Sequence, residues 1–200
     1  DVTGEDGKID PGANVIMGEL PGMGLASLRM SVYYFELLEK KGLKTHYVRA
    51  DLDNNAMIVR PAAFFGEGVE IICRFVAVGS FIRRYGKYAA SGKKLNALVE
   101  MTLKDDERGD PLITDEALEQ LGIMTIDQYN QAKELVRNVS CIVRDDLAAK
   151  GLELYDIKFE LAMVDGQLAI IDDISGGNMR VFNKGEQVDP LVLSALVTAK

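Results

Sequence analysis

The sequence predicts an α+β fold built from antiparallel strands and packed helices. Apolar residues recur at helical spacing in two segments, near residues 26–41 and 126–150, and short β-rich runs lie between and after them. The dipeptide Asp165-Gly166 joins two of those runs directly, which is typical of an antiparallel hairpin. A length of 200 residues suits one ordinary domain or two small lobes that share a core.

The first half of the chain is expected to begin with a loop and continue into a helix. Residues 1–24 are rich in glycine, which is typical of loops with short strands. Apolar residues from Leu28 to Leu38 repeat at helical spacing, and Gly42 follows as a stop signal, so we expect a helix over 26–41. Short β-rich runs follow at residues 45–49, 56–60, 69–78 and 95–103.

The second half is expected to contain a long helix followed by a hairpin. Thr125 and Gln128 form a capping-box pattern that opens a helix ending near Gly151. Residues 152–174 are expected to form a strand, a tight turn and a second strand, and residues 190–199 a last helix. No internal repeat, low-complexity tract or linker interrupts this order.

Charge and hydropathy exclude several classes of function. The 23 basic and 31 acidic residues give a net charge of −8, which argues against non-specific binding to nucleic acid or to an anionic membrane. The sequence contains no run of 18 or more apolar residues, so no membrane-spanning helix is expected. No signal peptide is visible either, so a cytoplasmic location is expected. Two cysteines and a single histidine, His46, are too few for a disulfide framework or a metal site built on several histidines.

The segment 155–161 alternates apolar and charged residues, so its apolar side chains share one strand face that suits a core. The opposite face carries three charged residues: Asp156, Lys158 and Glu160. Two carboxylates flanking an ammonium group form either a solvated ion-pair ladder or part of a site. The next strand is apolar until Asp172 and Asp173, and acidic groups that end a buried strand need a positive partner.

The length of the hairpin loop decides which aspartate joins this charged face. A three-residue loop pairs Lys158 with Asp172 and sets Asp172 diagonal to Glu160, within reach of one bridging cation. A two-residue loop puts Asp173 on that face instead, and the sequence does not fix the register. Two carboxylate ligands fit Mg²⁺, which takes few carboxylates together with substrate phosphates, and Lys158 suits a phosphate oxygen.

A second polar segment runs from Arg74 to Arg84. Arg74 stands in an otherwise apolar strand and needs a partner, while Gly79-Ser80 is expected to interrupt that strand and offers backbone N–H groups and a hydroxyl. A surface basic cluster is the alternative interpretation. A third segment, 104–112, is a charged loop that sets Asp110 before a proline, and a solvated loop is its simpler interpretation.

Together these segments resemble the family of phosphoribosylaminoimidazole-succinocarboxamide synthases, also called SAICAR synthetases. The resemblance spans essentially the whole chain. It is carried in one order by the blocks Tyr34–His46, Arg74–Arg84, Lys104–Pro111, Asp156–Glu160 and Asp172–Arg180.

The resemblance implies a two-lobed fold with ATP in a cleft between the lobes, here residues 1–62 and 63–200. It implies a ligase of purine biosynthesis that uses ATP and Mg²⁺. ATP activates the carboxylate of 5-aminoimidazole-4-carboxylate ribonucleotide as an acyl phosphate, and the amine of L-aspartate displaces the phosphate to give the succinocarboxamide. No nucleic acid or membrane partner is implied, and a homodimer is compatible with the family.

The resemblance also assigns roles to residues, by match of motif. The expected catalytic residues are Lys158, Asp156 and Asp110. The residues expected to contact the ribonucleotide are Arg74, Ser80 and Arg180. Glu160, Asp172 and Lys104 are expected at the nucleotide, with Glu160, Asp172 and Asp6 facing the metal.

Three departures from the family pattern accompany these matches. No Gly-Lys-x-Lys strand is present, and Asp1 is expected to fall after it; Met23 stands where the family usually has a lysine; and the loop 175–180 lacks the common Ser-Pro-Asp sequence. They keep two alternatives open: another ATP-dependent ligase or kinase on the same scaffold, and a non-catalytic nucleotide-binding fragment.

Overall fold

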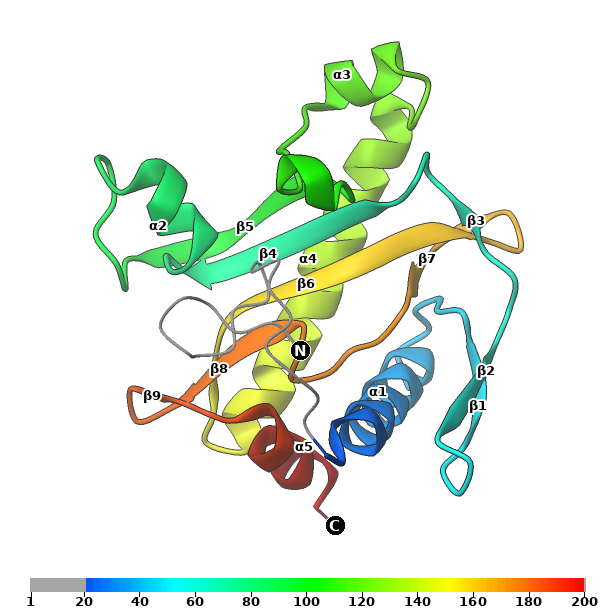
Figure 1. Ribbon diagram of the computed structural model, residues 1–200, viewed down its shortest axis with the longest axis vertical. Helices are drawn as coiled ribbons and strands as arrows, with labels where there is room; N and C mark the ends of the chain where they lie inside the picture. The colour runs from blue at the N-terminus through cyan, green and yellow to red at the C-terminus, as the bar shows by residue number, and fades with distance from the viewer. Residues whose placement is uncertain (1–20, 200) are drawn as a thin grey trace.

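A seven-stranded antiparallel sheet organises the computed structural model, which describes residues 21–199 (Figure 1). The main path of the sheet is β5-β4-β6-β8-β9, and β3 and β7 pair with the long strand β6. The strands are β3 (Ala63–Phe64), β4 (Val69–Val76), β5 (Lys94–Leu103), β6 (Glu153–Val164), β7 (Gln167–Ile171), β8 (Met179–Asn183) and β9 (Glu186–Gln187). The expected α+β class with antiparallel sheets is confirmed.

Five α-helices accompany the sheet in the described part of the chain. They are α1 (Met23–Lys40), α2 (Ser80–Tyr85), α3 (Asp115–Gln120), α4 (Ile126–Ala149) and α5 (Pro190–Thr198), with a short 3₁₀ helix, η1, at Asp106–Arg108. Helix α4 begins with the expected capping box: the Thr125 hydroxyl accepts from the Gln128 N–H at 3.1 Å, and the Gln128 side chain accepts from the Thr125 N–H at 2.9 Å. None of the helices within residues 21–199 is long and apolar enough to cross a membrane.

Helix α4 covers one face of the sheet, behind β4, β5 and β6 in the view of Figure 1. The predicted apolar face of β6 meets it there, because Ile157, Phe159 and Leu161 are each 1% exposed. Burial of alternate residues on a strand leaves the intervening side chains on the other face. The sheet therefore carries its charged residues on the face away from α4.

A separate two-stranded sheet, β1 (Tyr47–Asp51) with β2 (Ala56–Val59), lies beside α1 (Figure 1). The boundary expected between residues 62 and 63 falls after β2, just before the chain enters the large sheet. Helix α1 from one side of that boundary packs against α5 from the other. A division into lobes of residues 1–62 and 63–200 stays a prediction.

The hairpin between β6 and β7 has a two-residue loop, with Val164 opposite Gln167 and Glu160 opposite Ile171. Asp165 and Gly166 have φ values of 49° and 74°, the left-handed pair that a type I′ turn requires. The three-residue register is therefore wrong. Asp172 has φ of 66° and turns the chain out of strand β7. The pairing between β6 and β7 therefore ends at Ile171.

Two local expectations need correction. Gly79-Ser80 does not interrupt a strand, because β4 ends at Val76 and Ser80 opens helix α2. The segment after Asp173 contains a further strand, β8, which pairs with β6 and was not expected. The strand has five residues and follows Gly176 and Gly177, so the sequence shows no clear strand alternation there.

Candidate active site

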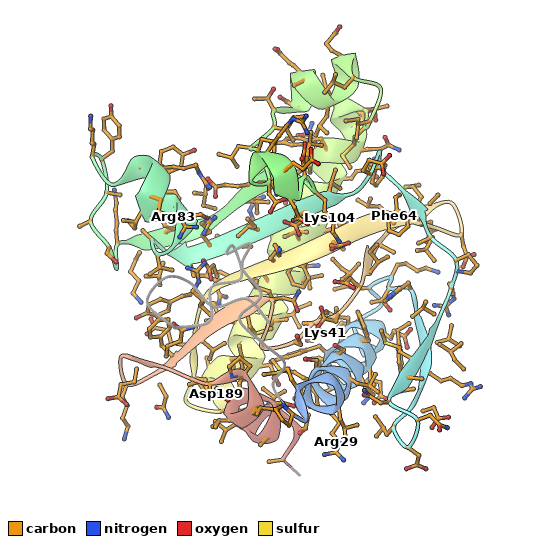
Figure 2. The ribbon with its side chains drawn as sticks, viewed as in Figure 1. Arg29, Lys41, Phe64, Arg83, Lys104 and Asp189 are labelled. Atoms are coloured by element: carbon orange, nitrogen blue, oxygen red, sulfur yellow. The ribbon has the colours of Figure 1, made fainter. Side chains whose placement is uncertain are left out.

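A cleft of about 320 Å³ lies on the polar face of the sheet, away from α4. Its floor follows from the register of two strands, in which Glu70, Ile72 and Arg74 of β4 lie opposite Glu160, Lys158 and Asp156 of β6. Helix α2 and the loop after η1 contribute its walls. Figure 2 shows Arg83 at α2 and Lys104 farther along the sheet, nearer to Phe64. The two positively charged side chains therefore lie toward different ends of the polar face.

Arg74 is the centre of the α2 end. Its side chain is 1% exposed, and its Nε donates to Glu100 Oε2 at 2.6 Å. Its Nη1 donates to Asp156 Oδ2 at 3.1 Å, and its Nη2 donates to Ser80 Oγ at 2.8 Å. The expectation that Arg74 requires a partner is confirmed, and the surface-cluster interpretation is wrong for this residue. A buried guanidinium with these partners fixes the positions of a carboxylate and a hydroxyl that line the cleft.

Arg180 reaches the same end from β8, where it lies opposite Asp156. Its Nε is 3.5 Å from Asp156 Oδ1, so this carboxylate stands between two guanidinium groups. Gly79 makes the approach of Arg180 sterically possible: a Cβ at position 79 would lie 1.8 Å from Arg180 Nη1. Gly79 also has φ of 53°, which favours glycine, and a Cβ there would displace the Arg180 guanidinium from this position.

Lys158 and Glu70 form an ion pair in the middle of the cleft floor, with Nζ donating to Oε1 at 2.8 Å. Burial raises the pKa of the Glu70 carboxyl group; Lys158 opposes this shift, and the carboxylates of Asp110 and Glu160 add to it. Lys158 therefore pairs across the strands with Glu70 of β4, in place of the ion-pair ladder along β6 that was the alternative to a site. Sequence reasoning missed Glu70, although it stands four residues before Arg74 in a strand and therefore on the same face.

Asp110 lies in the loop after η1 and lines the cleft. Its Oδ1 accepts from the backbone N–H of Asp105 at 2.9 Å, and its φ is 49°. Aspartate tolerates this left-handed conformation better than most residues because its side chain can bond locally to the backbone. The segment is therefore a shaped loop beside the cleft, and a catalytic role for Asp110 stays a prediction.

The other end of the sheet face gathers Lys104, Glu160, Asp172 and Asp173. Lys104 Nζ donates to Glu160 Oε1 at 2.6 Å; this hydrogen bond, followed by the charges of Glu160 and Asp172, raises the pKa of Lys104 despite opposing desolvation. Desolvation raises the pKa of both aspartates, and for Asp172 the charge of Asp173 adds to the effect. Glutamate and aspartate oxygens thus crowd one place beside the ammonium group of Lys104.

This carboxylate end fits the donor chemistry of Mg²⁺, which takes oxygen ligands and needs only one or two carboxylates beside phosphates and waters. Within residues 21–199, no group of three or more histidine, cysteine, aspartate or glutamate side chains is arranged to hold a metal ion by itself. Glu160 and Asp172 would thus supply part of a coordination shell. Asp6, the third expected ligand, lies outside the described residues.

The residues expected from the sequence fall into two groups. Those expected at the chemistry and at the ribonucleotide all line the one cleft: Arg74, Ser80, Asp110, Asp156, Lys158 and Arg180. Those expected at the nucleotide, Lys104, Glu160 and Asp172, lie beside it. Among the described residues, sequence reasoning missed Glu70 and Asn178 in the lining and Glu100 behind it.

A cleft lined by arginines, with carboxylates and a lysine beside it, is typical of an enzyme for anionic, phosphate-bearing substrates. The family model for SAICAR synthetase matches residues 12–191 of the chain. A phosphoribosylaminoimidazole-succinocarboxamide synthase of Clostridium tetani is 50% identical over 199 residues, which covers 98% of this chain and 88% of the relative. One from Thermotoga maritima is 35% identical over 172 residues, covering 85% and 73%.

Solved structures agree with these relatives. A SAICAR synthetase in complex with ADP superposes with a TM-score of 0.85 at 27% identity, covering all of this chain and 88% of that one. A SAICAR synthetase from Pyrococcus horikoshii gives a TM-score of 0.82 at 26% identity, covering 92% and 86%. The chain belongs to the SAICAR synthetase family.

Proposed function

We propose that the cleft on the polar face of the sheet is where this chain, an ATP-dependent ligase of the SAICAR synthetase family, joins its substrates. The reaction unites L-aspartate with 5-aminoimidazole-4-carboxylate ribonucleotide to give the succinocarboxamide. The observation that supports the location is the convergence of Arg74, Ser80, Asp156, Lys158 and Arg180 in one cavity.

The α2 end takes the ribonucleotide. Ser80 and Arg180 line the cavity and offer a hydroxyl and a planar fork of N–H donors, which suit a 5′-phosphate. Arg74 is 1% exposed and holds Ser80 and Asp156 in place, so its role is to position them as well as to supply positive charge. The ribonucleotide carboxylate then points along the floor toward Lys158.

ATP takes the end formed by Lys104, Glu160 and Asp172. The solved relative that holds ADP supports nucleotide binding by this fold. Glu160 and Asp172 would hold Mg²⁺, which when bound lowers the negative charge of the phosphates. Lys104, whose side chain is 48% exposed, is free to meet a phosphate oxygen once Glu160 engages the metal.

The reaction then needs two steps along the floor. The ribonucleotide carboxylate attacks the γ-phosphorus of ATP, forming an acyl phosphate and releasing ADP. The neutral aspartate amine attacks the acyl carbon, the C–N bond forms, inorganic phosphate leaves with the electron pair of the broken C–O bond, and the amine proton passes to the departing phosphate. Lys158, held by Glu70 at 2.8 Å, places a fixed positive charge beside the oxygens that gain charge in both steps.

A direct assay tests this function. Purified protein mixed with ATP, Mg²⁺, the ribonucleotide and L-aspartate is expected to give ADP, phosphate and succinocarboxamide in equal amounts. Panels of other amines and carboxylates test the alternative raised by the loop 175–180, whose residues Asn178 and Arg180 line the cleft. A clear preference for another substrate pair, or no product at high enzyme concentration, contradicts the proposal.

Two further expectations remain part of this proposal. The ribonucleotide substrate is a phosphorylated purine intermediate, so we place the activity in the cytoplasm, which fractionation of cells would test. A homodimer is compatible with the family resemblance, and sedimentation of the purified chain would distinguish it from a monomer.

A further inference from the structure

The carboxylate of Glu100 lies where two arginines from different elements converge. Its Oε2 accepts from Arg74 Nε at 2.6 Å and from Arg84 Nη2 at 2.8 Å. The Glu100 side chain is 10% exposed and that of Arg74 1%, so this ion pair forms largely out of water, whereas the Arg84 side chain is 30% exposed. Nothing in the sequence motifs pointed to this residue, and it is not one of the described residues that line the cleft.

The strand register explains how Glu100 reaches this place. Glu100 lies opposite Ile72, which lines the cleft, and residues directly opposite on neighbouring strands project to the same face. Arg74 lies two residues along β4 and is therefore its diagonal neighbour, within reach of long side chains. The helix α2 carries Arg84 back over the same point.

The Arg74 guanidinium is planar, so a partner that fixes its Nε edge also fixes the direction of its two Nη groups. Those groups hold Asp156 at 3.1 Å and Ser80 at 2.8 Å, and both of these residues line the cleft. The second ion pair of Glu100 ties Arg84, and with it helix α2, to strand β5. One carboxylate therefore aligns the cleft floor with its α2 wall.

We propose that Glu100 is a positioning residue for the ribonucleotide end of the site, acting through Arg74 and Arg84. This inference rests on the proposed function, because it takes the α2 end of the cleft as the ribonucleotide site. Glu100 touches no substrate. It orients the groups that do, and it leaves the nucleotide end, where Lys104 pairs with Glu160, unaffected.

The charges of the cluster agree with this role. Glu100 and Asp156 supply two negative charges against the three positive charges of Arg74, Arg84 and Arg180. Glu100 takes up positive charge behind the cleft wall, so the remaining excess stays on the side where Arg84 and Arg180 line the cavity. A phosphate is the kind of ligand that such an excess favours.

Steady-state kinetics of Glu100→Gln test the inference. Glutamine keeps the size of the side chain but loses the charge that holds two guanidinium groups. The KM for the ribonucleotide is expected to rise about tenfold, the loss expected for one charged hydrogen bond. The KM values for ATP and L-aspartate and the kcat are expected to stay within about twofold.

Glu153→Gln is the matched control. Glu153 is an ion-paired glutamate of the same sheet, bonded to Lys94, but it is 51% exposed and is not among the described residues that line the cleft. Its substitution is expected to change none of the kinetic constants. Glu100→Asp keeps the charge and is expected to recover part of the ribonucleotide affinity that Glu100→Gln loses. If Glu100→Gln acted only by unfolding the protein, restoring the charge would not change the ribonucleotide affinity selectively.

The outcomes separate this inference from the function on which it rests. An active Glu100→Gln variant with unchanged ribonucleotide KM, or with equal changes for ribonucleotide and ATP, overturns the positioning role. Titration calorimetry of the ribonucleotide against the wild-type chain and both Glu100 variants makes the same comparison without turnover. A wild-type chain that binds no ribonucleotide contradicts the proposed function and, with it, the role of Glu100.

Discussion

The two ends of the polar face are built in opposite ways. At the α2 end, Arg74 is 1% exposed and its side chain bonds to two carboxylates and a hydroxyl. At the other end, Glu160, Asp172 and Asp173 share one lysine, Lys104, and burial raises the pKa of both aspartates. The first end is held together by its own contacts, whereas the second holds excess negative charge.

This difference indicates how each end meets its ligand. A network held by several buried contacts is rigid and can recognise one shape, such as a ribonucleotide. A crowded carboxylate group gains stability from an added cation, so a metal–nucleotide complex completes it. Variants at the two ends should therefore fail differently, one set in stability and specificity and the other in metal-dependent nucleotide binding.

The largest effect is expected from Arg74→Met. Removing the guanidinium leaves the carboxylates of Glu100 and Asp156 without a main partner in a buried place. Breaking a buried ion pair costs about 3–5 kcal/mol of unfolding free energy, and product formation should be lost. Urea denaturation measures the change. Lys94→Met, which breaks an exposed pair with Glu153, is the control and should unfold close to the wild-type midpoint.

Gly79→Ala is expected to have the next largest effect. The new Cβ would lie 1.8 Å from Arg180 Nη1, so Arg180 must move out of its place in the cleft. Ribonucleotide KM should rise about tenfold, and strain at positive φ should cost about 1–3 kcal/mol. Gly92→Ala separates the two causes, because Gly92 has φ of 84° but nothing within 4 Å of its added Cβ. An equal rise in ribonucleotide KM for Gly92→Ala would contradict the role of the collision.

The carboxylate end predicts a pH effect of defined sign. The pKa of Asp172 and Asp173 is raised in the folded chain, so the folded state holds their protons more tightly than the unfolded state. Their contribution to stability is then fully present below the ordinary aspartate pKa, near pH 4, and is lost as the pH rises through the raised values. The variant Asp172→Asn/Asp173→Asn should melt above the wild type at pH 7, with the difference fading toward pH 3.

The same double variant also tests the ligand at this end. Adding ADP with Mg²⁺ should raise the melting temperature of the wild-type chain and leave that of the double variant unchanged. ADP with EDTA, in place of Mg²⁺, is the control. A double variant that melts lower than the wild type at pH 7, or that keeps its response to Mg²⁺ and ADP, contradicts the interpretation of this end as a site for a cation.

The smallest effect is expected from Lys104→Met. The Lys104–Glu160 pair lies near the surface, with side-chain exposures of 48% and 15%, so its loss should cost about 0–1 kcal/mol of stability. The KM for ATP should nevertheless rise severalfold, because the lysine is proposed to meet a phosphate, while the ribonucleotide KM stays constant. A shift in ribonucleotide KM equal to that for ATP would show that the two ends are not separate.

Much of the fold could be predicted because residue types and their local spacing determine it. The capping box at Thr125 and the apolar stripe that follows fixed α4, and alternation along β6 correctly separated Phe159 from Lys158. Short elements escaped: α2 and β8 have 6 and 5 residues, too few for a periodic signal. The hairpin register stayed open because a shift of one residue changes no local propensity.

The candidate site divides along the same line. Its residue types stood in the motifs, so Arg74, Lys158, Glu160 and Arg180 could be named from the sequence. Their pairing could not, because Arg74 meets Glu100 across β4 and β5, and Lys158 meets Glu70 rather than its own strand neighbours. These pairs join residues 26 and 88 positions apart in the chain.

The sequence by itself determined the fold class, the family and the list of charged residues that a phosphate-handling site requires, since each is written in residue type and local spacing. The tertiary structure decided which charged groups pair with one another. It therefore decided that one end of the face is held together by its own ion pairs and that the other has excess negative charge, which suits a cation. Electrostatic pairing depends on distance and burial, and both are set only when strands remote in sequence come to lie side by side.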